Sequence, residues 1–123
     1  MKKLIVLGIL FLSSISFAQD KELCKKWLFN FKTVKSIKAK PSQEEKNYSI
    51  TFFQNFKFEE IENGSYIYGK WKWNKLKNKI ILVGYEIPNY LIFNILKLTH
   101  DELVFETKDI MNETIVMYLK SDK

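Results

Sequence analysis

The chain has no arginine, one cysteine and one histidine, and each shortage excludes a class of protein or a means of stabilising the fold. All cationic side chains are lysines, so the bidentate contacts that arginine makes with phosphates and guanine edges are missing. We therefore expect no nucleic-acid partner. Cys24 has no second cysteine with which to form an intramolecular disulfide, so the fold must rest on its hydrophobic core. The thiol itself is buried, free or part of an intermolecular bridge.

Catalytic and metal-binding patterns are also scarce. His100 falls in a predicted turn, and the sequence has no nucleophile elbow that could place a serine beside it. A dyad of His100 with Cys24 has no support in the sequence. One histidine and one cysteine do not make a zinc ligand set, and no loop has the spacing of calcium ligands. We expect a protein that is not an enzyme and has no catalytic residue, metal or cofactor.

The first eighteen residues have the three parts of a secretory signal peptide. Lys2 and Lys3 form a basic start, residues 4–12 are an unbroken apolar run, and Ser16-Phe17-Ala18 places small residues before a cleavage site. The uncharged stretch is shorter than the ~18 residues that a membrane anchor needs. We expect cleavage after Ala18, a single mature domain over residues 19–123 with no transmembrane segment, and an extracytoplasmic location, either periplasmic or secreted.

The chain that remains after the leader fits one domain. It has 105 of the 123 residues, and because the leader takes two lysines and no acid, the net charge falls from +6 to +4. The lysines are spread along the chain, and only residues 70–79 are dense in them. This spread favours a solvated surface over a phosphate-binding or membrane-binding patch. Eight of the ten phenylalanines and all three tryptophans lie after the leader, and they are enough to fill the interior of a domain of this size.

Alternation of apolar and polar residues dominates after residue 26, and turn residues interrupt it at regular intervals. A short helical turn is expected at Asp20–Lys26, with Asp20 as its cap. Eight strands are expected, at Trp27–Ile37, Tyr48–Phe53, Phe56–Glu62, Ser65–Asn74, Lys79–Tyr85, Tyr90–Leu98, Glu102–Lys108 and Glu113–Lys120. In the first strand, Trp27, Phe29 and Phe31 should share one face and Lys32 the other. Residues 38–47 are expected to form a polar loop, and Asn63-Gly64 a tight hairpin turn.

Short links between consecutive strands predict an all-β fold built as an antiparallel up-and-down meander. A meander of about eight strands can remove its edges by closing into a barrel, whose interior is filled by side chains or holds one small ligand. The segment Ile80–Val83 is apolar on both faces, which is unusual for a sheet with one wet side. A cover from the N-terminal segment, a partner surface or a different register would explain it.

Four stretches look like the motifs of one family. Residues 23–27 (Leu-Cys-Lys-Lys-Trp) look like an opening Leu-x-Gly-x-Trp, and residues 49–58 look like a second hairpin. Residues 68–73 (Tyr-Gly-Lys-Trp-Lys-Trp) look like a Gly-x-Trp strand, and residues 95–105 like a closing hairpin with Leu-Thr-x-Asp-Glu-Leu. Together they resemble the lipocalin-like domains exported by Bacteroidetes-type bacteria, small β-barrels related to the calycins.

The resemblance covers essentially the whole mature chain and has two implications. It implies a lipocalin-like barrel and, by the ligand-carrier role of better-known lipocalins, a small apolar ligand. The chain departs from the pattern at Lys25, where the family has a glycine that permits close packing at the barrel base. This departure bears on where the first strand starts.

The aromatic residues contain the candidate ligand contacts. If the rings fill the barrel they form a packed core, and if gaps remain they line an apolar cavity. The residues expected to line such a cavity are Phe29, Phe31, Phe52, Phe58, Trp71, Phe93 and Phe105. Glu59 and Glu60 should point to opposite faces, so they cannot act as a pair, and whichever pointed inward would need a partner.

Two functions correspond to these alternatives. The first is an exported lipocalin-like barrel that binds a small hydrophobic molecule or a lipid in its interior. The second is a solid-core barrel that acts on a protein partner through its outer face or loops, as an inhibitor, an immunity-type partner or an envelope assembly factor. The two-sided apolar strand Lys79–Tyr85 favours the second function, and the aromatic residues together with the resemblance favour the first.

Overall fold

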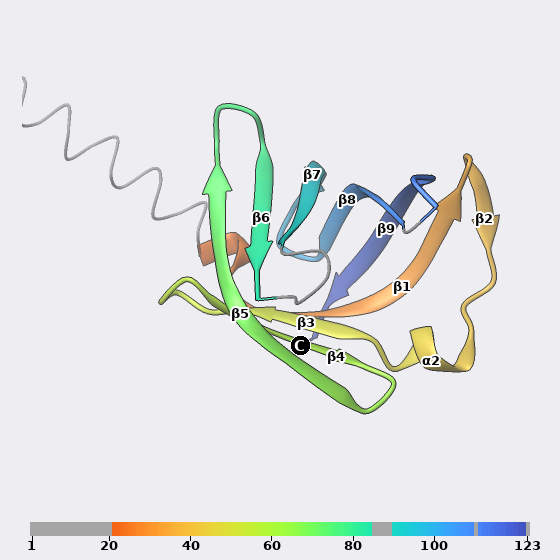
Figure 1. Cartoon of the computed structure of the whole chain (residues 1–123), viewed down its shortest axis with the longest axis horizontal. Coiled ribbons are helices and arrows are strands. Elements are labelled where there is room, and N and C mark those ends of the chain that lie inside the picture. Colours follow the sequence, from red (N-terminus) through yellow and green to blue (C-terminus); the bar gives the residue numbers. More distant parts are fainter. Residues whose placement is uncertain (1–20, 85–89, 110, 123) are drawn as a thin grey trace, which may run out of the picture.

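The computed structural model describes residues 21–84, 90–109 and 111–122, and within them nine strands form one antiparallel sheet (Figure 1). The strands are β1 Lys26–Val34, β2 Ile37–Ala39, β3 Ser49–Phe52, β4 Lys57–Glu62, β5 Ser65–Asn74, β6 Lys79–Val83, β7 Tyr90–Leu98, β8 Glu102–Lys108 and β9 Thr114–Ser121, and the helix α2 spans Gln43–Lys46. The expected leader, the expected cap Asp20 and residues 85–89, which include the last residue of the expected strand Lys79–Tyr85, lie outside the described residues.

Strand β1 closes the barrel because it pairs along both of its edges. Trp27 lies opposite Ile50 of β3 on one edge and opposite Ser121 of β9 on the other. From β3 to β9 each strand pairs antiparallel with the next. In the described part of the chain this gives a closed barrel of eight strands, with β2 added beside the far end of β1 (Figure 1). The predicted all-β, up-and-down barrel is confirmed.

A β-bulge in β1 reverses the faces predicted for the second half of that strand. Phe29 and Phe31 lie opposite consecutive residues of β9, so Asn30 is the extra residue. Phe31 lies on the outer face, where its ring stacks on Tyr118 with 4.2 Å between centroids, and Lys32 points into the barrel. The prediction that placed Phe31 with Phe29, and Lys32 opposite them, is wrong because one inserted residue inverts a pattern of period two.

The predicted polar loop after the first strand contains regular structure. Lys35 and Ser36 both have positive φ and form a two-residue turn, so the predicted first strand is two strands, β1 and β2. The helix α2 starts with a capping box. The Ser42 Oγ accepts a hydrogen bond from the Glu45 N–H at 3.1 Å, and Glu45 Oε1 accepts one from the Ser42 N–H at 3.0 Å.

The tight turns largely follow the sequence signals. Asn63 and Gly64 have φ of 50° and 79°, the two positive values that a hairpin turn of this length requires. Phe56 was predicted to begin a strand, but it lies in the turn before β4 with φ of 65°. A bulky residue is strained in this conformation. The Phe56 ring packs against Trp71 with 5.1 Å between centroids.

Large apolar side chains fill the end of the barrel where β1 begins and β3 ends. This closed-end cluster consists of Leu23, Trp27, Phe52, Phe58 and Trp71, none of which is more than 1% exposed. The Trp27 indole N–H donates to the Leu23 carbonyl at 2.9 Å, and that of Trp71 donates to the Phe53 carbonyl at 3.1 Å. Residues 21–23 are helical, within the span predicted for a helical turn, and Leu23, the last of them, packs into this cluster.

Gly69 allows β5 and β6 to approach closely beside the cluster. A Cβ at this position would lie 2.2 Å from the Val83 carbonyl oxygen and 2.7 Å from Cε1 of Phe58. Strand β5 changes its partner here, from β4 to β6, at Lys70. The motif Gly-x-Trp therefore requires glycine at this position for a steric reason. Any side chain would separate the strands that hold Trp71 in place.

The outer face of β6 and β7 is apolar and exposed. Ile80 and Leu82 point into the core, whereas Val83 points outward and is 44% exposed. Tyr90 and Ile92 on β7 continue this outward-facing strip, at 54% and 36% exposed. None of the helices among the described residues has the length and apolar character needed to cross a bilayer.

Candidate functional site

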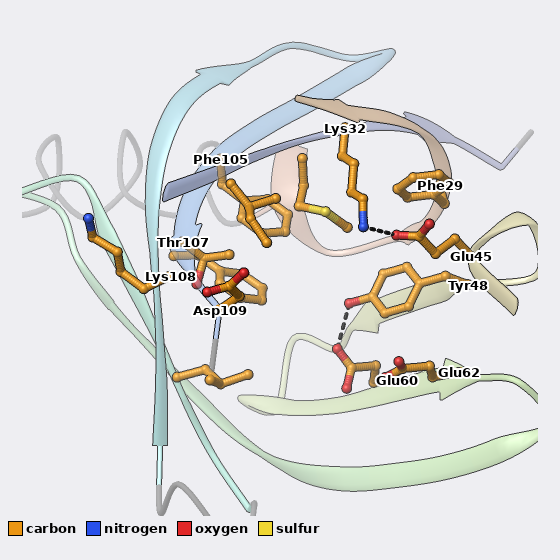
Figure 2. Close-up of a pocket in the computed structure, with 14 residues that line it drawn as sticks. Phe29, Lys32, Glu45, Tyr48, Glu60, Glu62, Phe105, Thr107, Lys108 and Asp109 are labelled. Carbon is orange, nitrogen blue, oxygen red and sulfur yellow. Dashed lines mark hydrogen bonds and ion pairs between the residues drawn. The ribbon is translucent and has the colours of Figure 1, made fainter. Parts of the chain in front are cut away.

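A cavity of about 300 Å³ opens at the end of the barrel opposite the closed-end cluster (Figure 2). It lies where β1, β4 and β8 end and where β7 and β9 begin. Its apolar lining consists of Phe29, Leu91, Phe93, Phe105, Ile115 and Met117. Its polar lining consists of Lys32, Glu45, Tyr48, Glu60, Glu62, Thr107, Lys108 and Asp109. The volume is at the lower limit of small-molecule sites, which are typically about 300–1,000 Å³.

Aromatic rings form the apolar wall. Phe93 and Phe105 lie on the adjacent strands β7 and β8, and their rings stack with 3.9 Å between centroids. Phe29 meets Tyr48 edge to face with 6.5 Å between centroids. Such pairs orient the rings as well as bury them. The wall is therefore defined by ring contacts within the barrel.

An ion pair lies on one side of the cavity. The bulge at Asn30 directs Lys32 inward, and its ammonium lies 2.5 Å from Glu45 Oε2 (Figure 2). Both side chains are about one quarter exposed, at 24% and 27%. The capping box at Ser42 holds the other Glu45 oxygen. The carboxylate thus joins α2 to β1 and leaves the Lys32 ammonium already neutralised.

The contacts of Glu45 also change its acidity. Burial by itself raises the pKa of a carboxyl group. The hydrogen bond from Lys32, those from Ser42 and the positive charge of Lys32 together exceed that effect, so the pKa of Glu45 is lowered from the ordinary value of 4.5. The group is ionised at neutral pH.

A second polar pair lies deeper, beneath the ion pair. Glu60 is only 5% exposed, and its Oε2 accepts a hydrogen bond from the Tyr48 hydroxyl at 2.5 Å (Figure 2). Tyr48 comes directly before β3, and its N–H donates to the Glu45 carbonyl, so α2 and β3 position it together. As predicted for neighbours on a strand, Glu59 and Glu60 point to opposite faces, with Glu60 inward.

The remaining polar residues form the rim of the opening. Asp109 Oδ1 accepts a hydrogen bond from the Glu113 N–H at 2.8 Å. The Lys108 ammonium donates to the Thr114 hydroxyl at 2.7 Å and points away from the cavity in Figure 2. The opening is therefore lined by carboxylates. Of the two lysines in the lining, Lys108 directs its ammonium away from the cavity, toward Thr114.

The predicted site residues are divided between three places. Three of the seven line the cavity: Phe29, Phe93 and Phe105. Three others belong to the closed-end cluster: Phe52, Phe58 and Trp71. Phe31 lies on the outer face. The two sequence alternatives, a packed core and a hollow one, are both present at opposite ends of one barrel.

The sequence interpretation missed the polar half of the cavity. The Ser42-x-x-Glu45 pattern is a capping-box signal that could have revealed α2. The inward position of Glu60 was one of two options left open by the alternation. The inward position of Lys32 had no sequence signal, because nothing in the chain marks a bulge at Asn30. His100, the expected turn residue, lies between β7 and β8, with its Nδ1 3.7 Å from Glu22 Oε1.

Comparison with known proteins supports the fold. No protein family model matches the chain, and a search of curated proteins finds no match by sequence. Among solved structures, the chain is similar to a lipocalin-like protein from Bacteroides uniformis, with a TM-score of 0.60 and 12% sequence identity. The match covers 82% of this chain and 99% of the other. At this identity the likeness concerns the fold alone, and the chain has the lipocalin-like barrel fold.

Proposed function

We propose that this protein is an exported barrel that binds one small, largely apolar molecule without transforming it. The open cavity of about 300 Å³, with its stacked Phe93–Phe105 wall, is the observation that carries the proposal. A barrel of eight strands is just wide enough to hold one small ligand. The aromatic and aliphatic lining supplies apolar contact, and the polar rim fixes the orientation of the ligand.

The sequence supports the remaining parts of the proposal. The basic, apolar and small-residue segments of residues 1–18 support export. Fractionation of the producing cells and N-terminal sequencing should give a mature protein that begins at Gln19 and lies outside the cytoplasm. A binding role rather than catalysis fits the location of His100, which lies in a turn at the closed end, away from the cavity.

The test uses octan-1-ol as a neutral probe of matching size. Titration followed by NMR should shift the methyl signals of Leu91, Ile115 and Met117, which line the cavity. Met117→Trp should abolish binding because the indole fills the space. Val116→Trp is the matched control, since Val116 directly precedes Met117 on β9 and points to the outer face. Equal binding by both variants, or no binding by the wild type, would refute the proposal.

A second function is supported by the outer face of β6 and β7. Its exposed apolar strip, Val83, Tyr90 and Ile92, is a surface of the kind that protein partners cover. If this strip is the functional surface, Ile92→Lys should abolish capture of a defined envelope protein while octan-1-ol binding is unchanged. The cavity-filling Met117→Trp should then have no effect on capture.

A further inference from the structure

The outer face of β4, β5 and β6 gathers lysines that are separated in the sequence. Lys57 on β4 lies directly opposite Lys70 on β5, and Lys72 follows on the same face of β5. Lys79 lies on the outer face of β6, and the one acid that the described part of this face contains is Glu59. None of the four lysines forms an ion pair within the described residues. The face is therefore positively charged.

The pairing of two lysines is unfavourable for the sheet by itself. Like charges directly opposite each other on neighbouring strands destabilise the pairing of those strands. Lys57 and Lys70 are such a pair, and both side chains are exposed. An anion bound between the two ammoniums would remove the repulsion.

A hollow of about 480 Å³ lies beside this pair. It lies where β4 begins, because β4 pairs with β5 only as far as Lys70. Its lining includes Lys57, Lys70 and Lys72 together with the rings of Phe56, Trp71 and Trp73, and no acid is among its described lining residues. Lysine binds phosphate as a point charge, and three ammoniums beside apolar rings match the phosphate end of an amphiphile.

The exposed apolar strip of β6 and β7 borders these lysines. Val83 lies opposite Lys70 on β5 and opposite Tyr90 on β7. Two residues earlier on β6, Ile81 repeats this arrangement, with a lysine of β5 on one side and Ile92 on the other. A row that crosses β4–β7 spans three strand spacings, or about 15 Å. The four neighbouring strands thus form one surface, basic on one side and apolar on the other (Figure 1).

This combination favours a lipid surface over a protein as the occupant. The cores of protein interfaces are depleted in lysine and enriched in arginine, which this chain lacks. An anionic bilayer attracts each lysine near its surface, and the lysine stem covers apolar surface while its ammonium reaches the headgroups. Tyrosine is enriched where a membrane meets water. Besides Tyr90, the outer face of β5 carries Tyr66 and Tyr68, which stack on each other and are 57% and 63% exposed.

We infer that the outer face of β4–β7 docks on an anionic lipid bilayer. The lysines contact the lipid phosphates, one of which occupies the hollow beside Lys57, and the apolar strip enters the headgroup region. This docking does not use the cavity inside the barrel, so the inference goes beyond the proposed function. It also names a bilayer, in place of a protein partner, as the occupant of the strip.

Vesicle flotation tests the inference with two lipid compositions. The purified protein is mixed with vesicles of phosphatidylcholine alone or of phosphatidylcholine and phosphatidylglycerol in equal parts, and it should float only with the anionic vesicles. Raising the salt from about 0.1 M to about 1 M should release most of it, because the Debye length falls from about 10 Å to about 3 Å. Ile92→Ser should weaken binding, whereas Ile37→Ser, at an exposed position on β2, should not.

Matched lysine variants assign the binding to this face. Lys70→Gln combined with Lys72→Gln should weaken binding to anionic vesicles by about tenfold. The control is Lys38→Gln combined with Lys120→Gln, which removes the same charge from β2 and β9, two strands that pair with none of β4–β7. The control should bind like the wild type. All variants share one N-terminus, so any contribution of the apolar leader cancels, and octan-1-ol binding in the cavity should be unchanged in each.

The outcomes separate this inference from the proposed function. An equal loss of binding in the two lysine pairs would overturn the assignment to this face, and equal binding to neutral and anionic vesicles would overturn the role of the lysines. Absence of vesicle binding would overturn the inference, and capture of an envelope protein that depends on Ile92 would then assign the strip to a protein partner. Failure to bind octan-1-ol would refute the proposed function and leave this inference standing.

Discussion

At the scale of single residues, Glu45 and Tyr48 each make two contacts that shape the cavity. Glu45 caps α2 with one carboxylate oxygen and pairs with Lys32 through the other. Tyr48 donates to Glu60 and packs its ring against Phe29. Because each group holds an element and lines the cavity, its replacement should affect stability as well as binding. The effects on stability and on binding can be distinguished by measuring at different pH values and by choosing suitable variants.

The Lys32–Glu45 pair makes stability depend on pH. Glu45→Gln keeps the capping box, because glutamine also serves at this position, and removes only the charge. We expect a loss of about 1 kcal/mol in the free energy of unfolding at about pH 7. The pKa of Glu45 is lowered in the folded state, so its contribution is present above the ordinary value of 4.5 and is lost as pH falls through the folded pKa. Urea unfolding of both proteins from about pH 7 to about pH 2 should show the difference shrinking.

A double-mutant cycle provides the control for this prediction. In a Lys32→Met background the same Glu45→Gln change should cost much less at about pH 7, because the partner charge is gone. A difference that stayed constant across the pH range would mean that the ion pair does not contribute to stability.

At the scale of elements, single insertions and turns decide which side chains meet. The bulge at Asn30 exchanges Phe31 for Lys32 inside the barrel. The two-residue turn at Lys35-Ser36 starts β2 and so leads the chain toward α2. Gly69 sets the closest approach of β5 to β6. These local features determine the polar side of the cavity.

The hairpin turn between β4 and β5 tests the role of positive φ. Gly64 has φ of 79°, and a Cβ there would meet no atom within 4 Å. Gly64→Val should therefore destabilise through backbone conformation alone, by about 1–2 kcal/mol. Gly64→Asn should cost less, since asparagine adopts this conformation more readily. Thermal unfolding of the two variants compares them, and equal melting temperatures would contradict the argument.

At the scale of the whole molecule, the barrel is packed at one end and hollow at the other. The closed-end cluster joins β1, the β3–β4 hairpin and β5, so it connects distant parts of the chain. The cavity end is lined by the other ends of β1 and β4 and by residues of β7, β8 and β9. Stability should therefore depend mainly on the closed end, and binding on the open end.

Trp27 tests this division. Its ring is fully buried, and its indole N–H donates to the Leu23 carbonyl. Trp27→Ala should lower the free energy of unfolding by about 3–5 kcal/mol, because a large cavity replaces the ring. Trp27→Phe should cost less, since it keeps an aromatic ring and loses the hydrogen bond. Chemical denaturation measures both, and a small effect of Trp27→Ala would show that the closed end does not dominate stability.

Apart from β2, the strands, most turns and the closed barrel could be predicted from the sequence, because period-two alternation and residues such as Asn63-Gly64 act through local geometry. The sequence also indicated that aromatic rings such as Phe93 and Phe105 would face the interior. Which end of the barrel is hollow, and that Lys32 and Glu60 line it, could be seen only in the folded structure. A bulge carries no sequence signal of its own, and packing depends on strands that are far apart in the chain. The chemistry of the opening therefore became visible only after the barrel had closed.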